Sequence, residues 1–87
     1  MPRISSFYGI MITMYWRERD HPVAHFHASY AGQSASIALD GTILGGTLPP
    51  RALRLVREWT HLHGDELLAN WERARDCDPL DQIDPLS

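Results

Sequence analysis

This sequence contains a single cysteine, no lysine and no long apolar run. The one cysteine, Cys77, excludes a disulfide within the chain. No stretch reaches the roughly 18 consecutive apolar residues that a membrane-spanning helix needs, so we expect no membrane contact. The first residues lack the apolar core and the cleavage site of a secretory signal. A glycine-rich phosphate loop and a nucleophile elbow are also missing. Together these absences predict a cytoplasmic protein without a familiar catalytic signature.

The charged residues are unevenly distributed along the chain. The net charge of −3 argues against bulk electrostatic binding of nucleic acid, although a nucleic-acid partner stays possible. Residues 1–60 carry six Arg against four acids, a net of +2, whereas residues 61–87 carry two Arg against seven acids, a net of −5. The acidic end could neutralise the rest of the molecule, or it could face a basic partner.

A chain of 87 residues is long enough for one domain. We assign residues 1–76 to a single α+β domain and residues 77–87 to an acidic, proline-containing tail. Leu80, Ile83 and Leu86 could dock this tail on the domain, and without such docking we expect it to be disordered.

Several segments of the first half have the side-chain alternation of β-strands. In the first of them, Gly9 indicates a bulge or a close backbone approach. In the second, His25 and His27 fall on the same face. Asp40-Gly41 is a strong hairpin signal between the last two. The expected strands are residues 7–16, 25–30, 33–39 and a short 42–44.

The second half of the chain predicts one long amphipathic helix. Thr47 or Leu48 could cap it, and the prolines that follow are tolerated in a first turn. An apolar stripe with helical spacing skips once near Gly64, so two short helices are an alternative. The stripe resumes on nearly the same face, which favours one helix. The stripe consists of Ala52, Val56, Trp59, Leu62, Leu67, Trp71 and Ala74.

These elements predict the α+β class. We expect an antiparallel β-meander of three to four strands, with one long C-terminal amphipathic helix packed on one face. Such a sheet leaves its other face and its edge strands uncovered, so a protein partner or a second copy of the chain could cover them.

Five segments carry motifs that resemble one family. They read M-P-x-I-S-x-F-Y-G-I, D-H-P-x-x-H-F-H-x-x-Y, L-P-x-R-A-L-R-L-V-x-E-W, E-L-L-x-N-W-x-x-A-R and a final acid-Pro-Leu. They occupy Met1–Ile10, Asp20–Tyr30, Leu48–Trp59, Glu66–Arg75 and Asp84–Leu86. In these motifs the chain resembles the domain of unknown function 4160 family of small bacterial proteins.

The resemblance implies a partner and no chemistry. The family has no established activity, so no catalytic residue can be transferred from it. Its members are often encoded beside another small uncharacterised domain, which implies a paired system such as a toxin–antitoxin pair. This association favours a protein partner and says nothing of mechanism.

The densest polar cluster consists of Asp20, His21, His25 and His27. On one strand, His25 and His27 point the same way, about 6–7 Å apart along the chain. Neutral imidazole is a good ligand for zinc, nickel or copper, so three or four ligands of a divalent transition metal could converge here. The spacing matches no specific zinc signature, however, and it is more typical of strand histidines that hydrogen-bond to their neighbours.

The same histidines could act in acid–base catalysis. His25 and His27 could serve as general base and general acid in metal-independent RNA cleavage, as in many small toxins. Such a site also needs a cation to hold phosphate, and Arg17 or Arg19 could supply it.

Arg51, Arg54 and Arg57 recur every third residue at the start of the predicted helix. Positive charge there opposes the helix dipole and costs roughly a few tenths of a kcal/mol per residue. This placement favours an anionic ligand such as phosphate. Alternatively, the three form a solvated face that pairs with Glu58 and with the acidic tail.

Our first hypothesis is therefore a small interaction module, one partner of a toxin–antitoxin-like pair. The alternative is a metal-binding or hydrolytic, RNase-like protein that uses His21, His25 and His27. The sequence leaves open whether the protein is an enzyme.

Overall fold

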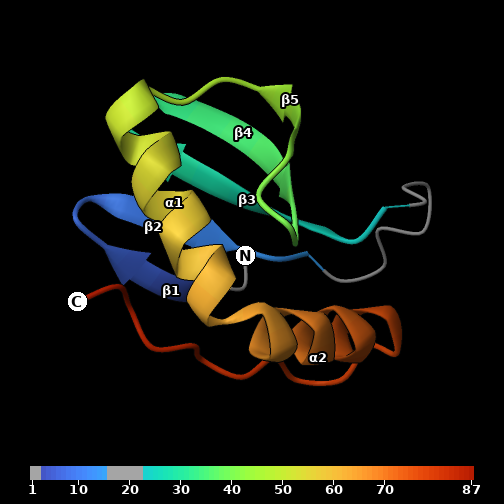
Figure 1. Cartoon of the computed structure of the whole chain (residues 1–87). Helices are drawn as coiled ribbons and strands as arrows, with labels where there is room; N and C mark the ends of the chain where they lie inside the picture. Colours follow the sequence, from blue (N-terminus) through green and yellow to red (C-terminus); the bar gives the residue numbers. More distant parts are fainter. Residues whose placement is uncertain (1–2, 16–22) are drawn as a thin grey trace.

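The first half of the chain forms an antiparallel sheet in which each strand pairs with the next (Figure 1). The computed structural model describes residues 3–15 and 23–87. Since neighbours in the sequence are neighbours in the sheet, the topology is a simple meander. Its five strands are β1 (Arg3–Phe7), β2 (Ile10–Thr13), β3 (His25–Tyr30), β4 (Gln33–Ala38) and β5 (Ile43–Gly46). The expectation of three to four strands was therefore one to two strands short.

The extra strand arises at the N-terminus, where the prediction of one strand over residues 7–16 was wrong. Tyr8 (φ 51°) and Gly9 (φ 81°) form a tight turn that pairs Phe7 with Ile10 and folds the segment into the β1–β2 hairpin. Two successive positive φ angles are typical of the two-residue turns that match the twist of a hairpin. Gly9 is therefore a turn residue.

The strands expected at 25–30 and 33–39 are present as β3 and β4. Asp40-Gly41 turns the chain into β5, as the sequence indicated. One carboxylate oxygen of Asp40 accepts a 2.9 Å hydrogen bond from the Thr42 backbone N–H. Hydrogen bonds from Thr42 hold the pKa of Asp40 below its ordinary value, because they stabilise the charged carboxylate.

Two helices follow the sheet, so the prediction of one long helix was wrong. α1 (Pro50–Leu62) lies across one face of the sheet, and α2 (Gly64–Arg75) runs in a different direction below it (Figure 1). His63 separates them with φ −122° and ψ 27°, although its backbone N–H still bonds to the Trp59 carbonyl. The N-cap of α1 is Pro49, not Thr47 or Leu48, and makes no side-chain cap.

The core lies between the sheet and the two helices, with Trp59 of α1 at its centre. The fully buried Trp59 ring has its centroid 5.5 Å from that of Phe7 and 5.7 Å from that of Phe26. Leu67 and Ala74 of α2 are also buried, which the change of direction at His63 allows. Among the described helices, none is long and apolar enough to cross a membrane.

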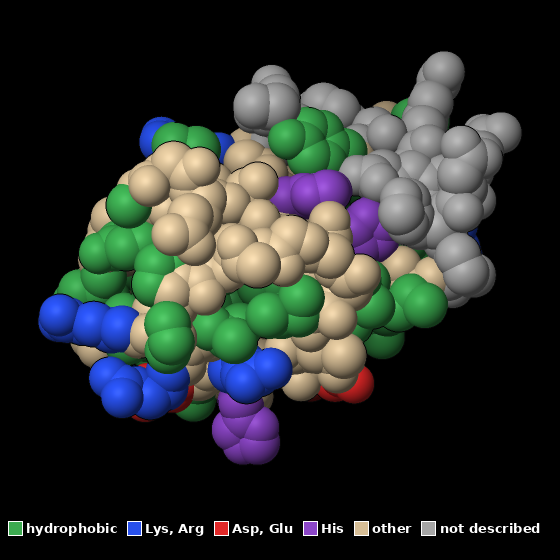
Figure 2. Space-filling model, turned by 90° about the horizontal axis from the view of Figure 1, so that it is seen from above, with side chains coloured by type: hydrophobic (Ala, Val, Ile, Leu, Met, Phe, Trp, Pro, Cys, Tyr) green, Lys and Arg blue, Asp and Glu red, His purple; other side chains and the backbone are tan. Residues whose placement is uncertain are grey.

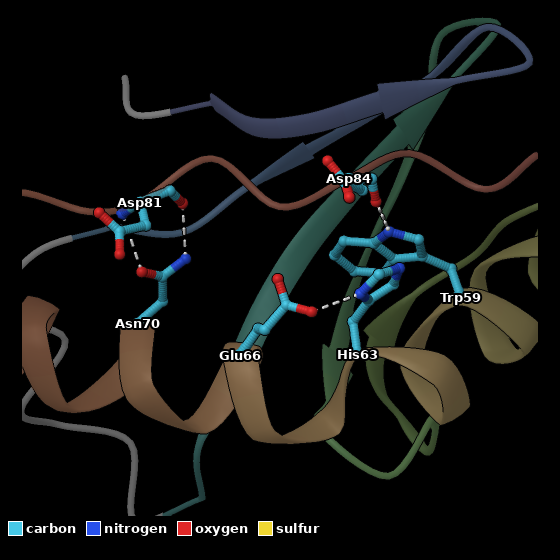
Figure 3. Close-up of polar contacts among 6 residues, drawn as sticks. All are labelled: Trp59, His63, Glu66, Asn70, Asp81 and Asp84. Carbon is cyan, nitrogen blue, oxygen red and sulfur yellow. Dashed lines mark hydrogen bonds and ion pairs between the residues drawn. The ribbon is translucent and has the colours of Figure 1, made fainter.

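The C-terminal segment returns along β1 and packs on the domain (Figure 3). The Ile83 backbone N–H donates to the Ile4 carbonyl at 2.8 Å, and the Ile83 side chain is buried. The buried Asn70 side chain both donates to the Asp81 carbonyl and accepts from the Asp81 N–H. The Trp59 indole N–H donates to the Asp84 carbonyl.

Candidate functional site

The face of the sheet opposite α1 carries small hydroxyl side chains and the histidines of β3. Register places Thr13 beside His27 and His27 beside Ser36 on three neighbouring strands, so these side chains share one face. Met11 on this face is 40 % exposed. We call the whole set the open face: Ser6, Met11, Thr13, His25, His27, Ser29, Ser34, Ser36 and Ala38.

His25 is a buried, oriented member of this face. Its imidazole Nδ1 lies 2.9 Å from the Val23 carbonyl oxygen. A carbonyl can only accept, so Nδ1 carries the proton of this hydrogen bond. The ring centroid of Trp71 on α2 is 5.2 Å away. His25 thus links the end of the sheet to α2.

His27 is half-buried, whereas His25 is buried. The two imidazole centroids are 5.3 Å apart at 75°. The Tyr15 ring packs edge-on against His27 at 4.7 Å. The Ser36 hydroxyl is within hydrogen-bond distance of the His27 Nδ1, at 3.3 Å. Four rings thus form a row from Tyr15 to Trp71, with His27 accessible within it.

The structure brings together only part of the predicted metal cluster. His25 and His27 are neighbours, whereas Asp20 and His21, like Arg17 and Arg19, lie outside the described residues. Within residues 3–15 and 23–87, no group of three His, Cys, Asp or Glu side chains could hold a metal ion. Two imidazoles are fewer than the three or four protein ligands typical of zinc, so the metal site stays a prediction.

The three arginines of α1 have different surroundings. Arg57 donates from Nε to the Gly41 carbonyl at 3.1 Å and so supports the β4–β5 turn. Arg51 lines a hollow with Tyr8 and Tyr30, on another part of the molecule. Arg54 is exposed. The ion pairs among the described residues join other side chains, so the predicted pairing of Arg54 with Glu58 is absent from this part.

Figure 2 shows one histidine side chain (purple) beside several basic side chains (blue) at the lower edge of the view, and other histidine side chains apart from them. α1 lies on the face of the sheet opposite His25 and His27, so its arginines do not provide the phosphate-binding cation for these two histidines. The predicted anion site and the predicted histidine site are separate.

Three neighbours of the histidines were not recognised as site residues. Tyr15 alternates with Met11 and Thr13, and pairing of that strand with β3 was the signal that could have placed it beside His27. Trp71 was assigned to the apolar stripe, and no local signal links it to His25. Ser36 contacts His27 only through the β3–β4 register.

Comparison with known proteins identifies a family and no relative of known activity. A family model described as a domain of unknown function (DUF4160) matches residues 9–72. The matched region runs from the β1–β2 turn into α2 and includes His25, His27 and Trp71. No curated protein and no solved structure matches the chain.

Proposed function

This chain belongs to the DUF4160 family, whose description names no activity, and from its own geometry we propose that it is an interaction module that binds a basic protein partner on the open face. The observation that carries the proposal is the exposed part of the sheet face opposite α1. The long helix α1 covers one face, and exposed Met11, Ser29 and Ser34 lie on the other.

The shape of the open face suits a protein surface. Its hydroxyl side chains are short, so a partner can approach the sheet closely. They can also donate and accept hydrogen bonds without the desolvation cost of a charge. Met11 and Tyr15 add apolar contact, and methionine adapts readily to a partner. His27 contributes a ring nitrogen at the centre of the row of rings.

The size of the open face indicates that the partner also contacts α2. Five strands spaced about 4.8 Å apart and up to six residues long span at most roughly 24 by 20 Å, or roughly 480 Å². A typical complex buries about 800 Å² on each partner. The ring contact between His25 and Trp71 makes α2 the border of the open face and the natural extension of the interface.

Because the interface extends onto α2, the charge of α2 indicates a positively charged partner surface. The carboxylates of α2 and the tail are all exposed, and two arginines oppose them. A partner that reaches α2 therefore meets negative charge, which favours basic side chains on its surface. These acids are Asp65, Glu66, Glu72, Asp76, Asp78, Asp81 and Asp84. A toxin–antitoxin-like pair, in which the small protein encoded beside this one is the partner, fits this description.

The test is a titration of the protein with that neighbour, followed by calorimetry and by light scattering after size exclusion. We expect a stable complex whose affinity falls with added salt. The double variant Ser29→Arg, Ser34→Arg places two long cationic side chains on the open face, and we expect it to weaken binding at least about tenfold. Leu62→Arg, at the exposed end of α1, is the matched control. Two separate peaks at micromolar concentration would contradict the proposal.

The orientation of His25 favours a second candidate, a metal-binding or hydrolytic role. A backbone carbonyl that fixes Nδ1–H is typical of ligating and catalytic histidines, because it aims Nε2 at a ligand. The readouts are the metal content of untagged protein and cleavage of RNA at micromolar protein. His27→Ala is the informative variant, because the buried His25 also supports the fold. Wild-type protein that holds no metal and leaves RNA intact would exclude this role.

A further inference from the structure

We propose a second binding site, separate from the open face: the hollow between the β1–β2 turn and the first turn of α1 takes a carboxylate attached to one aromatic or branched apolar group. The hollow has a volume of about 180 Å³. Its lining residues are Tyr8, Ile10, Tyr30, Arg51, Ala52 and Leu55. Three segments of the sequence meet there, the same three that contain the F-Y-G-I, H-F-H-x-x-Y and P-x-R-A-L motifs.

The first observation is the backbone of Tyr8. Its φ of 51° lies in the left-handed region, which costs a residue with a side chain roughly 1–2 kcal/mol. The Tyr8 ring is 59 % exposed, so burial in the core does not offset this cost. Asn or Gly would serve the turn at lower cost. A strained residue that holds an exposed aromatic ring at the rim of a hollow indicates a function for the ring.

The turn also fits closely to the opposite wall of the hollow. A Cβ at Gly9 would lie 3.4 Å from the Tyr30 ring, at ordinary van der Waals distance, so that ring lies directly against the turn. Ile10, Ala52 and Leu55 provide apolar surface. A dry engineered cavity of about 150 Å³ can hold benzene, so this hollow has room for about one ring or one branched side chain.

The charge of the hollow selects an anion. The Arg51 guanidinium is exposed and makes no ion pair or hydrogen bond within the described residues. Two tyrosine hydroxyls can donate further hydrogen bonds, and the described residues of the lining include no carboxylate. A guanidinium binds a carboxylate through two parallel hydrogen bonds, which gives direction as well as affinity. The ligand is therefore an apolar group that carries a carboxylate, either a small free acid or the C-terminal residue of a peptide.

The experiment is a titration of the isotope-labelled full chain with three probes, followed by amide chemical shifts. The probes are 3-phenylpropanoate, a short peptide that ends in Phe with a free carboxylate, and the same peptide with a C-terminal amide. We expect the largest shifts at Gly9, Tyr30 and Arg51 with a carboxylate probe, and binding at least about tenfold weaker for the amide. The ratio of the first two affinities distinguishes a free acid from a peptide end.

Two variants and one control variant test whether the Arg51 guanidinium and the Tyr8 ring bind the ligand. Arg51→Gln should weaken carboxylate binding about tenfold or more, whereas Arg54→Gln, on the same helix outside the lining, should change it less than about twofold. Tyr8→Asn should raise the melting temperature by relieving the backbone and should still weaken binding. No localised shifts with either carboxylate at 10 mM, or equal losses in Arg51→Gln and Arg54→Gln, would overturn the proposal.

Discussion

Gly46 ends β5 opposite Ala35 of β4, where the two backbones leave no room for a side chain. Its φ is 78°, and a Cβ at this position would collide with the Ser34 carbonyl oxygen and lie 2.9 Å from the Ala35 Cα. Both obstacles are backbone atoms, so no side chain can move away. We expect Gly46→Ala to lower the free energy of unfolding by roughly 2–4 kcal/mol, measured by urea denaturation.

The adjacent glycine provides the control for this prediction. Gly45 is in the same strand, but a Cβ there would have no atom within 4 Å. Gly45→Ala should therefore change the free energy of unfolding by less than about 1 kcal/mol. Equal losses for the two variants would mean that any side chain in this part of β5 is unfavourable, and that the close approach to Ser34 does not decide the outcome.

Asp40 gives the β4–β5 turn a pH dependence. Thr42 lowers the pKa of Asp40 in the folded protein, so the folded state favours the charged carboxylate. The resulting stabilisation is complete above the ordinary aspartate pKa of roughly 4 and disappears as the pH falls through the lowered folded value. Asp40→Asn keeps an acceptor for the Thr42 N–H but does not titrate. The stability difference between wild type and Asp40→Asn should therefore shrink from pH 7 to pH 3, and a constant difference would contradict this assignment.

At the scale of elements, the sequence predicts the strands around the β3–β4 hairpin well and the N-terminal hairpin poorly. β3 and β4 have clear alternation and a turn that contains Gly32, whose φ is 83°. At the N-terminus, Tyr8 and Gly9 adopt the same pair of positive φ angles as Ala31 and Gly32, but the large apolar Tyr8 gives no turn signal. Apolar residues on both sides of Tyr8 then simulate one continuous strand.

The break between the helices has a similar physical reason. The apolar stripe continues past Gly64, so periodicity alone favours one helix. In the folded protein, His63 bends the chain so that Leu67 becomes fully buried while Leu62 is 63 % exposed. The His63 imidazole then lies 2.7 Å from a carboxylate oxygen of Glu66 at the start of α2. Tertiary burial, which local spacing does not encode, decides the direction of α2.

For the whole molecule, the sequence could predict the histidine pair but not its surroundings. Alternation within β3 is local, so His25 and His27 were expected on one face. Trp71 lies 46 positions after His25 in the sequence, and only the packing of α2 brings the two rings together. The hollow beside Arg51 likewise combines three distant segments. Local sequence patterns therefore cannot predict sites that form only through long-range packing.

The tail is part of the folded domain, and truncating a buried side chain in it should show how much the tail contributes to the stability of the whole molecule. Ile83 is 4 % exposed, and its backbone bonds to the edge strand β1. We expect Ile83→Ala to lower the free energy of unfolding by about 2–4 kcal/mol, because it leaves a cavity against the core. Leu62→Ala removes a similar side chain from an exposed position and should cost less than about 1 kcal/mol. Because a domain of this length has only about 5–15 kcal/mol of stability, the first loss should be plain in urea denaturation. If Ile83→Ala loses no more than Leu62→Ala, the tail contributes no stability and β1 is an open edge in solution, available to a partner strand.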